Sequence, residues 1–170
     1  MRFPRIMRIW FIRHARAIDR EATTLADFQR PLIPRGRKEF AQLCRHLAKR
    51  VKVPELLLCS PLVRAVQTAE IAAEEFELPP FRCRVDERLG PDLTPEKLRQ
   101  VLENVRAEFP EAERIGLVGH EPSFGEVTSA CIGGGRITLA KGGIAAVELA
   151  EPAAISKGEL RWIAIPKLFG

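Results

Sequence analysis

Three short, unbroken apolar runs, at residues 9–12, 56–59 and 115–119, set the architecture that this chain can adopt. Each run is bounded by charged residues, glycine or proline, as expected for strands buried on both faces of a parallel sheet. Stretches with helical periodicity separate the runs. Because strands that alternate with helices of this length are typical of parallel sheets, the sequence predicts an α/β fold with a mostly parallel central sheet.

Four helices are predicted from apolar spacing and from residues that favour helix starts. The first begins near Pro34, which suits a first helical turn, and the second begins at Ser60, an N-cap residue that is followed by Pro61. The third begins at Thr94, and a shorter fourth helix follows Pro122. These helices connect the predicted strands.

The last part of the chain has a different pattern. Residues 142–149 and 160–165 resemble two strands joined by a turn, which predicts an antiparallel hairpin at the edge of the sheet. A chain of 170 residues has the length of one domain, so we expect residues 1–170 to form a single three-layer domain with helices on both faces of the sheet. Met7 offers an alternative start, in which case residues 1–6 form a dispensable extension.

Composition limits the classes of function. Lys and Arg total 27 against 22 Asp and Glu, and the formal net charge of +5 is compatible with an anionic substrate or with weak affinity for nucleic acid. An aromatic content of 6% without tyrosine offers little for base stacking, which argues against nucleic acid. No uncharged apolar run approaches the roughly 20 residues that a membrane span needs, so no membrane partner is expected.

The four cysteines are widely spaced and form no C-x-x-C pair, which argues against a disulfide scaffold and against a structural zinc site. They are Cys44, Cys59, Cys83 and Cys131. This usage predicts buried thiols and a reducing, cytoplasmic location.

Reactive side chains follow each of the three apolar runs. Arg13 and His14 follow the first run, the segment 60–64 follows the second, and His120 follows the third. Functional groups of an open α/β sheet lie at the carboxyl ends of its strands, so we expect these side chains to converge at one edge.

Arginines without obvious carboxylate partners at such an edge indicate a site for phosphate or sulfate, because a guanidinium matches a tetrahedral oxyanion. Arg64 lies in the first turn of its predicted helix, where a positive side chain opposes the macrodipole at a cost of roughly 0.3–1 kcal/mol. An anionic ligand would offset that cost.

These residues resemble the motifs of the histidine phosphatase superfamily, the phosphoglycerate mutase-like proteins. Residues 13–15 resemble its R-H-G/A signature, residues 60–70 its S-P-x-x-R-A-x-Q-T-A-E motif, and residues 119–122 its second-histidine motif. The segment 30–36 is similar to the family's R-P-L-x-x-x-G segment. The short chain and the Ala after the first histidine are most similar to the small phosphohistidine phosphatase branch.

The resemblance implies a role for each matching residue. His14 would be the nucleophile that accepts the phosphoryl group, Arg13 and Arg64 would clamp its oxygens, and His120 would stabilise the transferring group. Arg30 would lie at the rim and contact substrate. Nearby arginines should lower the pKa of both histidines, whereas a bound phosphate should help His120 to stay protonated.

The general acid has no clear motif match. Mutase-type relatives carry a carboxylate after the third strand, where this chain has Asp86, Glu87 and Asp92, and Glu87 is the preferred candidate. Two positions depart from the branch: Arg16 stands where relatives often have a small or acidic residue, and Ile33 replaces the usual hydroxyl cap before the first helix.

We therefore expect a phosphatase that hydrolyses phosphohistidine on a phosphorylated protein, as in signal transduction, through a covalent phosphohistidine at His14. No metal and no other cofactor is expected, since no H-x-H or H-E-x-x-H pair occurs. One alternative is a phosphomonoesterase that acts on a small phosphorylated molecule. Another is a non-catalytic module that binds a phospho-ligand or nucleic acid.

Overall fold

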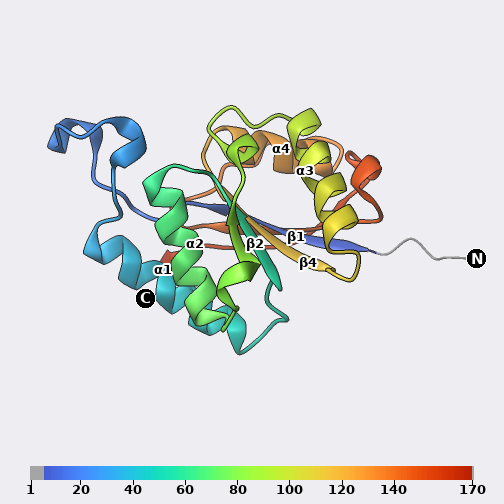
Figure 1. Ribbon diagram of the computed structural model, residues 1–170, viewed down its shortest axis with the longest axis horizontal. Coiled ribbons are helices and arrows are strands. Elements are labelled where there is room, and N and C mark those ends of the chain that lie inside the picture. The colour runs from blue at the N-terminus through green and yellow to red at the C-terminus, as the bar shows by residue number, and fades with distance from the viewer. Residues whose placement is uncertain (1–5, 170) are drawn as a thin grey trace, which may run out of the picture.

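A six-stranded sheet forms the centre of the computed structural model, which describes residues 6–169 (Figure 1). The strand order is β3-β2-β4-β1-β5-β6. The strands are β1 (Met7–Arg13), β2 (Leu56–Cys59), β3 (Cys83–Val85), β4 (Arg114–Gly119), β5 (Ile144–Leu149) and β6 (Glu159–Ala164). The first four are parallel, β5 is antiparallel to β1, and β6 is antiparallel to β5 at the edge. The predicted fold class is thereby confirmed, including the C-terminal hairpin.

Four helices cover the two faces of the sheet (Figure 1). They are α1 (Pro34–Ala48), α2 (Val63–Glu75), α3 (Pro95–Glu108) and α4 (Ser123–Cys131). Side chains alternate along β1, so that Phe11 packs in the same core cluster as residues of α3 and α4, and Ile12 packs with residues of α1 and α2. The alternation produces two apolar cores, one on each face, and a three-layer structure.

The second helix begins later than its sequence indicates. Ser60 and Pro61 favour a start at that point, but α2 begins at Val63, with Leu62 as its N-cap and without a side-chain cap. Ser60 is fully buried directly after β2, where its hydroxyl forms a hydrogen bond with His120 instead. The prediction of Ser60 as the N-cap was therefore wrong.

The segment between β1 and α1 projects from the domain as an arm, which we define as residues 16–33 (Figure 1). It contains the short 3-10 helices Arg20–Ala22 and Asp27–Gln29. Its two ends are held together: Ala17 and Leu32 form an antiparallel bridge, and the Ile33 amide donates a hydrogen bond to the Arg16 carbonyl over 3.0 Å. The arm is therefore closed at its base.

The cysteines, the N-terminal residues and the lack of a membrane span were also predicted from the sequence. Cys44, Cys59 and Cys131 are buried as predicted, but Cys83 is only half-buried because the short strand β3 lies at the sheet edge. Apart from Ile6, the predicted extension at residues 1–6 lies outside the described residues. Within residues 6–169 no helix is both long enough and apolar enough to cross a membrane.

Candidate active site

The carboxyl ends of three strands coincide. Arg13 is paired with Gly119 in the register of β1 and β4, and Cys59 is paired with Val118 in the register of β2 and β4. His14 therefore follows β1, His120 follows β4 and Ser60 follows β2. The two imidazole rings lie with their centroids 5.3 Å apart and their planes at 55°. The structure thus brings the two predicted histidines together.

His14 is held in one tautomer. Its Nδ1 lies 2.8 Å from the Ala15 carbonyl oxygen, and a carbonyl can only accept a hydrogen bond. In the neutral ring Nδ1 therefore carries the proton, and Nε2 carries the lone pair. A neutral imidazole with an available Nε2 is a competent nucleophile toward phosphorus.

The peptide that fixes this tautomer is itself fixed by α2. The Ala15 amide donates to Thr68 Oγ1 over 3.0 Å, and the Thr68 hydroxyl donates to the Arg64 carbonyl over 2.7 Å. Thr68 is fully buried. A chain of two hydrogen bonds therefore connects the first turns of α2 to the backbone beside His14.

His120 is bound on one side by Ser60. The His120 Nε2 lies 2.7 Å from Ser60 Oγ, which also accepts the Leu62 amide over 3.3 Å. When the Ser60 hydroxyl donates to Nε2, the neutral ring carries its proton on Nδ1. Nδ1 is buried and has no hydrogen-bond partner among the described residues.

Arg64 has a carboxylate partner, contrary to the expectation from sequence. Its Nη1 donates to the Asp27 carbonyl over 2.7 Å and its Nη2 to the Asp27 carboxylate over 3.1 Å. Arg64 lies in the first turn of α2, as predicted, and its side chain is only 5% exposed. Asp27 comes from the arm, and no local sequence pattern connects it with a residue 37 positions away.

Asp27 also binds Arg30, whose Nε donates to Asp27 Oδ1 over 3.0 Å. The Arg30 side chain is 12% exposed and lines the same cavity as the histidines. Burial would raise the pKa of Asp27, but the hydrogen bonds and charges of Arg30 and Arg64 outweigh this effect and lower that pKa to about 2. Asp27 therefore stays charged.

Arg13 is oriented by a neighbouring loop. Its Nη1 donates to the Leu139 carbonyl over 2.8 Å, and the Leu139 amide donates to the Glu121 carboxylate over 3.0 Å. Burial raises the pKa of Glu121, while its hydrogen bond from Leu139 and the charge of Arg13 act in the opposite direction. Glu121 thus supports the loop that positions Arg13.

Both histidines are neutral at pH 7. Burial is the main cause that lowers the pKa of His14 to about 4, and the charges of Arg64 and Arg13 add to the effect. Burial, followed by the neighbouring His14 and Arg64, lowers the pKa of His120 to about 3. The predicted direction is therefore correct, although desolvation contributes more than the arginines on which the prediction relied.

These groups line one cavity of about 350 Å³. Its walls include His14, His120, Arg13, Arg30 and Arg64. The buried Nε atoms of Arg13 and Arg64 have no hydrogen-bond partner among the described residues. The guanidinium groups in the wall suit an oxyanion by charge and shape.

Glu87 is not brought into this cavity. It lies exposed in the 3-10 helix Glu87–Leu89, and from the same segment Pro91 forms part of the cavity wall instead. Within residues 6–169, no group of three or more His, Cys, Asp or Glu side chains is arranged to hold a metal ion.

Sequence reasoning missed Asp27, Thr68 and Glu121. Thr68 lies inside the matching motif and Glu121 directly follows His120, so position relative to the site residues was the available signal for both. Asp27 had no such signal, because its role depends on how the arm folds back.

The fold and the two adjacent histidines at the strand ends define an α/β protein with a two-histidine site. The chain belongs to the histidine phosphatase superfamily, branch 1, whose family model matches residues 9–112. That range contains Arg13, His14, Arg30 and Arg64 and ends before His120.

Known proteins resemble the chain over most of its length. The solved structure of the protein histidine phosphatase SixA complexed with tungstate is 25% identical, has a TM-score of 0.81, and the match covers 96% of this chain and 100% of that chain. A mycobacterial glucosyl-3-phosphoglycerate phosphatase with VO3 is 16% identical, has a TM-score of 0.72, and the match covers 92% and 98% of the two chains. The second likeness concerns the fold alone. An uncharacterized protein of Picosynechococcus sp. is 36% identical over 141 residues, which are 81% of this chain and 82% of that protein.

Proposed function

We propose that this protein hydrolyses phosphohistidine through a phosphoryl group carried on His14, without a metal ion. The observation that carries the proposal is the orientation of His14: its Nδ1 is bound to the Ala15 carbonyl, and its Nε2 is available in a cavity that also contains His120, Arg13 and Arg64. The similarity to SixA supports phosphohistidine as the substrate.

The proposed reaction has two displacements. In the first, the lone pair of His14 Nε2 attacks phosphorus, the bond between phosphorus and the leaving group breaks, and the leaving group takes up a proton. In the second, water attacks the phosphoryl group, the bond from Nε2 to phosphorus breaks, and orthophosphate leaves. Charge spreads over the equatorial oxygens in each step, and Arg13, Arg64 and His120 would stabilise it.

The leaving group distinguishes the two enzymatic alternatives. An alkoxide leaving group needs a positioned proton donor, which typically raises the rate by about 10²–10⁴-fold. The nitrogen of phosphohistidine leaves more easily once solvent has protonated it. Glu87 lies outside the cavity wall and so gives no support to P–O substrates, although the carboxyl groups of Asp19, Glu21 and Glu121 do line the cavity. A small-molecule phosphomonoesterase remains the second candidate, since a glucosyl-3-phosphoglycerate phosphatase shares the fold.

We further propose that residues 1–170 act as one domain in the cytoplasm, on a phosphorylated protein in signal transduction. The three buried free thiols, Cys44, Cys59 and Cys131, fit a reducing compartment.

The decisive experiment compares wild-type turnover of a histidine-phosphorylated protein, an aryl phosphate and an alkyl phosphate. We expect phosphohistidine to be the best substrate and the alkyl phosphate the poorest, and His14→Ala to abolish all turnover. Glu87→Gln should barely change hydrolysis of phosphohistidine. A chelator should leave the wild-type rate unchanged.

Different outcomes would contradict different parts of the proposal. An alkyl phosphate that outruns phosphohistidine would favour the small-molecule phosphatase, and no turnover of any substrate would favour the binding module. Equal, large losses in Glu87→Gln on all three substrates would make Glu87 an obligatory acid. An acid-labile phosphoenzyme in His14→Ala would exclude His14 as the nucleophile, and inhibition by chelator would exclude metal independence.

A further inference from the structure

A second cavity, of about 740 Å³, adjoins the candidate active site. We call it the basic groove and define it by the side chains Arg16, Arg35, Lys38, Glu39, Lys141 and Lys167, which lie in its walls. They come from the base of the arm, the start of α1, the loop before β5 and the C-terminal 3-10 helix Pro166–Leu168. In Figure 1 the C-terminal end of the chain lies beside α1. Lys141 also lines the active-site cavity, so the two cavities meet at that side chain.

The groove has a large excess of positive charge. Five of the ten residues that line it are cationic, and the single carboxylate, Glu39, is shared between Arg16 at 3.0 Å and Arg35 at 2.6 Å. Lys141 is 3.9 Å from Asp19, which is a long ion pair. In the part of the chain that the structure describes, Lys38 and Lys167 form no ion pair with a carboxylate.

The start of α1 adds to the excess. Its first turn contains no acidic residue, and Ile33 supplies no side-chain cap. Arg35, Arg37 and Lys38 instead place positive charge near the positive end of the helix macrodipole, where anions are preferred. A bound anion would offset this unfavourable arrangement.

We propose that the basic groove binds an acidic segment of the phosphorylated protein whose phosphohistidine occupies the active site; this inference rests on the proposed function. Because Lys141 lines both cavities, a ligand that extends past this side chain can occupy both. The groove walls contain no aromatic side chain on which a base could stack, so the chemistry fits an acidic peptide better than a single-stranded nucleic acid. The groove therefore confers selectivity for acidic partners.

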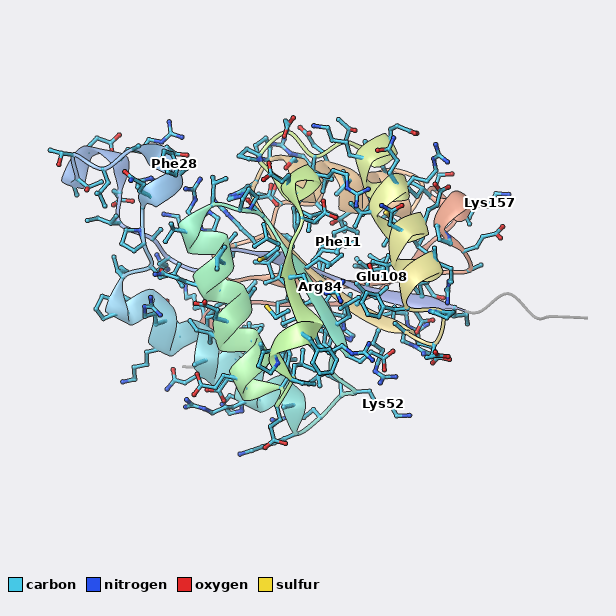
Figure 2. The ribbon with its side chains drawn as sticks, in the orientation of Figure 1. Phe11, Phe28, Lys52, Arg84, Glu108 and Lys157 are labelled. Atoms are coloured by element: carbon cyan, nitrogen blue, oxygen red, sulfur yellow. The ribbon has the colours of Figure 1, made fainter. Side chains whose placement is uncertain are left out.

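The test compares two variants that change the net charge equally. Lys38→Glu combined with Lys167→Glu reverses two charges in the groove. Lys49→Glu combined with Lys157→Glu reverses two exposed charges elsewhere, and Lys157 lies on the opposite side of the molecule from the arm in Figure 2. The substrates are a phosphohistidine peptide flanked by Asp and Glu, the same peptide flanked by Asn and Gln, and p-nitrophenyl phosphate.

For the groove variant we expect the KM of the acidic peptide to rise about tenfold, because two favourable charge interactions become repulsive. The KM of the amide peptide and the turnover of p-nitrophenyl phosphate should stay within twofold of wild type. The control variant should resemble wild type on all three substrates, and added salt should reduce the difference between the two peptides.

Equal effects on both peptides, or an equal effect of the control variant, would overturn the proposal. Single-stranded RNA that inhibits wild type competitively but not the groove variant would assign the groove to nucleic acid instead. Binding of the unphosphorylated acidic peptide, followed by fluorescence anisotropy, separates this inference from the proposed function. If phosphohistidine is not hydrolysed, weaker peptide binding by the groove variant alone still supports the groove, and unchanged binding overturns it.

Discussion

Thr68 is placed to control the nucleophile without touching the substrate. It holds the Ala15 peptide, whose carbonyl holds His14 Nδ1. Thr68→Val keeps the shape of the side chain but removes the hydroxyl, so the orientation of His14 should loosen. We expect kcat to fall by about 10- to 100-fold with little change in KM, because the cations that bind the phosphoryl group remain.

Thr68→Ser is the matched control, since it keeps the hydroxyl and should recover most of the rate. Nitrogen NMR of the His14 ring should report a smaller fraction of the Nδ1–H tautomer in Thr68→Val than in wild type. A fall in kcat without any change in the tautomer would show that Thr68 acts only on stability.

Substitutions of Arg64 and of Asp27 should change the affinity for an oxyanion in opposite directions. Arg64→Ala removes a buried cation, so the inhibition constant of tungstate as a competitive inhibitor should rise at least tenfold. The rate of hydrolysis should fall as well. Asp27→Asn leaves Arg64 less neutralised and should strengthen the inhibition by about three- to tenfold. Inhibition constants for the two variants and wild type provide the measurement. Unchanged inhibition in Arg64→Ala would place the oxyanion elsewhere.

At the scale of elements, Gly36 is the position at which α1 packs closely against the backbone that follows β1 and His14. A Cβ at this position would collide with the Arg16 carbonyl oxygen, which is two residues after His14. Intrinsic helix propensity alone favours Gly36→Ala by about 1 kcal/mol. The collision is with backbone, so we expect the opposite sign: a loss of about 1–3 kcal/mol in the free energy of unfolding, with reduced turnover.

Urea unfolding of Gly36→Ala and wild type measures this difference. Ala41→Gly, on the same helix, is the control and should destabilise by propensity alone. A more stable Gly36→Ala protein would show that α1 can move away from Arg16 without cost.

Local patterns were sufficient for long elements and insufficient where distant segments meet. The apolar runs of β1, β2 and β4 are uninterrupted, so the convergence of His14 and His120 could be predicted from strand direction alone. Strand β3 has only three residues, two of them exposed, and leaves no apolar signal. Ser60 has the local properties of an N-cap, but a tertiary contact with His120 engages its hydroxyl instead.

For the whole molecule, the two histidines link stability to pH. Their pKa values of about 4 and about 3 in the folded state lie below the ordinary 6.5, so the unfolded chain binds more protons between about pH 6.5 and pH 4. The free energy of unfolding should therefore fall as the pH falls through this window, by up to about 1.4 kcal/mol per pH unit for each histidine.

Denaturation in phosphate-free buffer at pH 7.5, 6 and 5 measures this dependence. The double variant His14→Gln with His120→Gln removes both titrating groups and should be much less sensitive over the same range. An equally steep dependence in the double variant would assign the effect to other groups.

The closed base of the arm has a consequence for how relatives of this protein could diverge. Because Ala17 and Leu32 are paired, the chain leaves the domain and returns to it at one place. Insertions between these two residues need not move the strand ends, and doubling the length of such a loop costs only about 0.6 kcal/mol in closure entropy. Lineages could therefore exchange whole arms and acquire new substrates while inheriting the same two histidines unchanged.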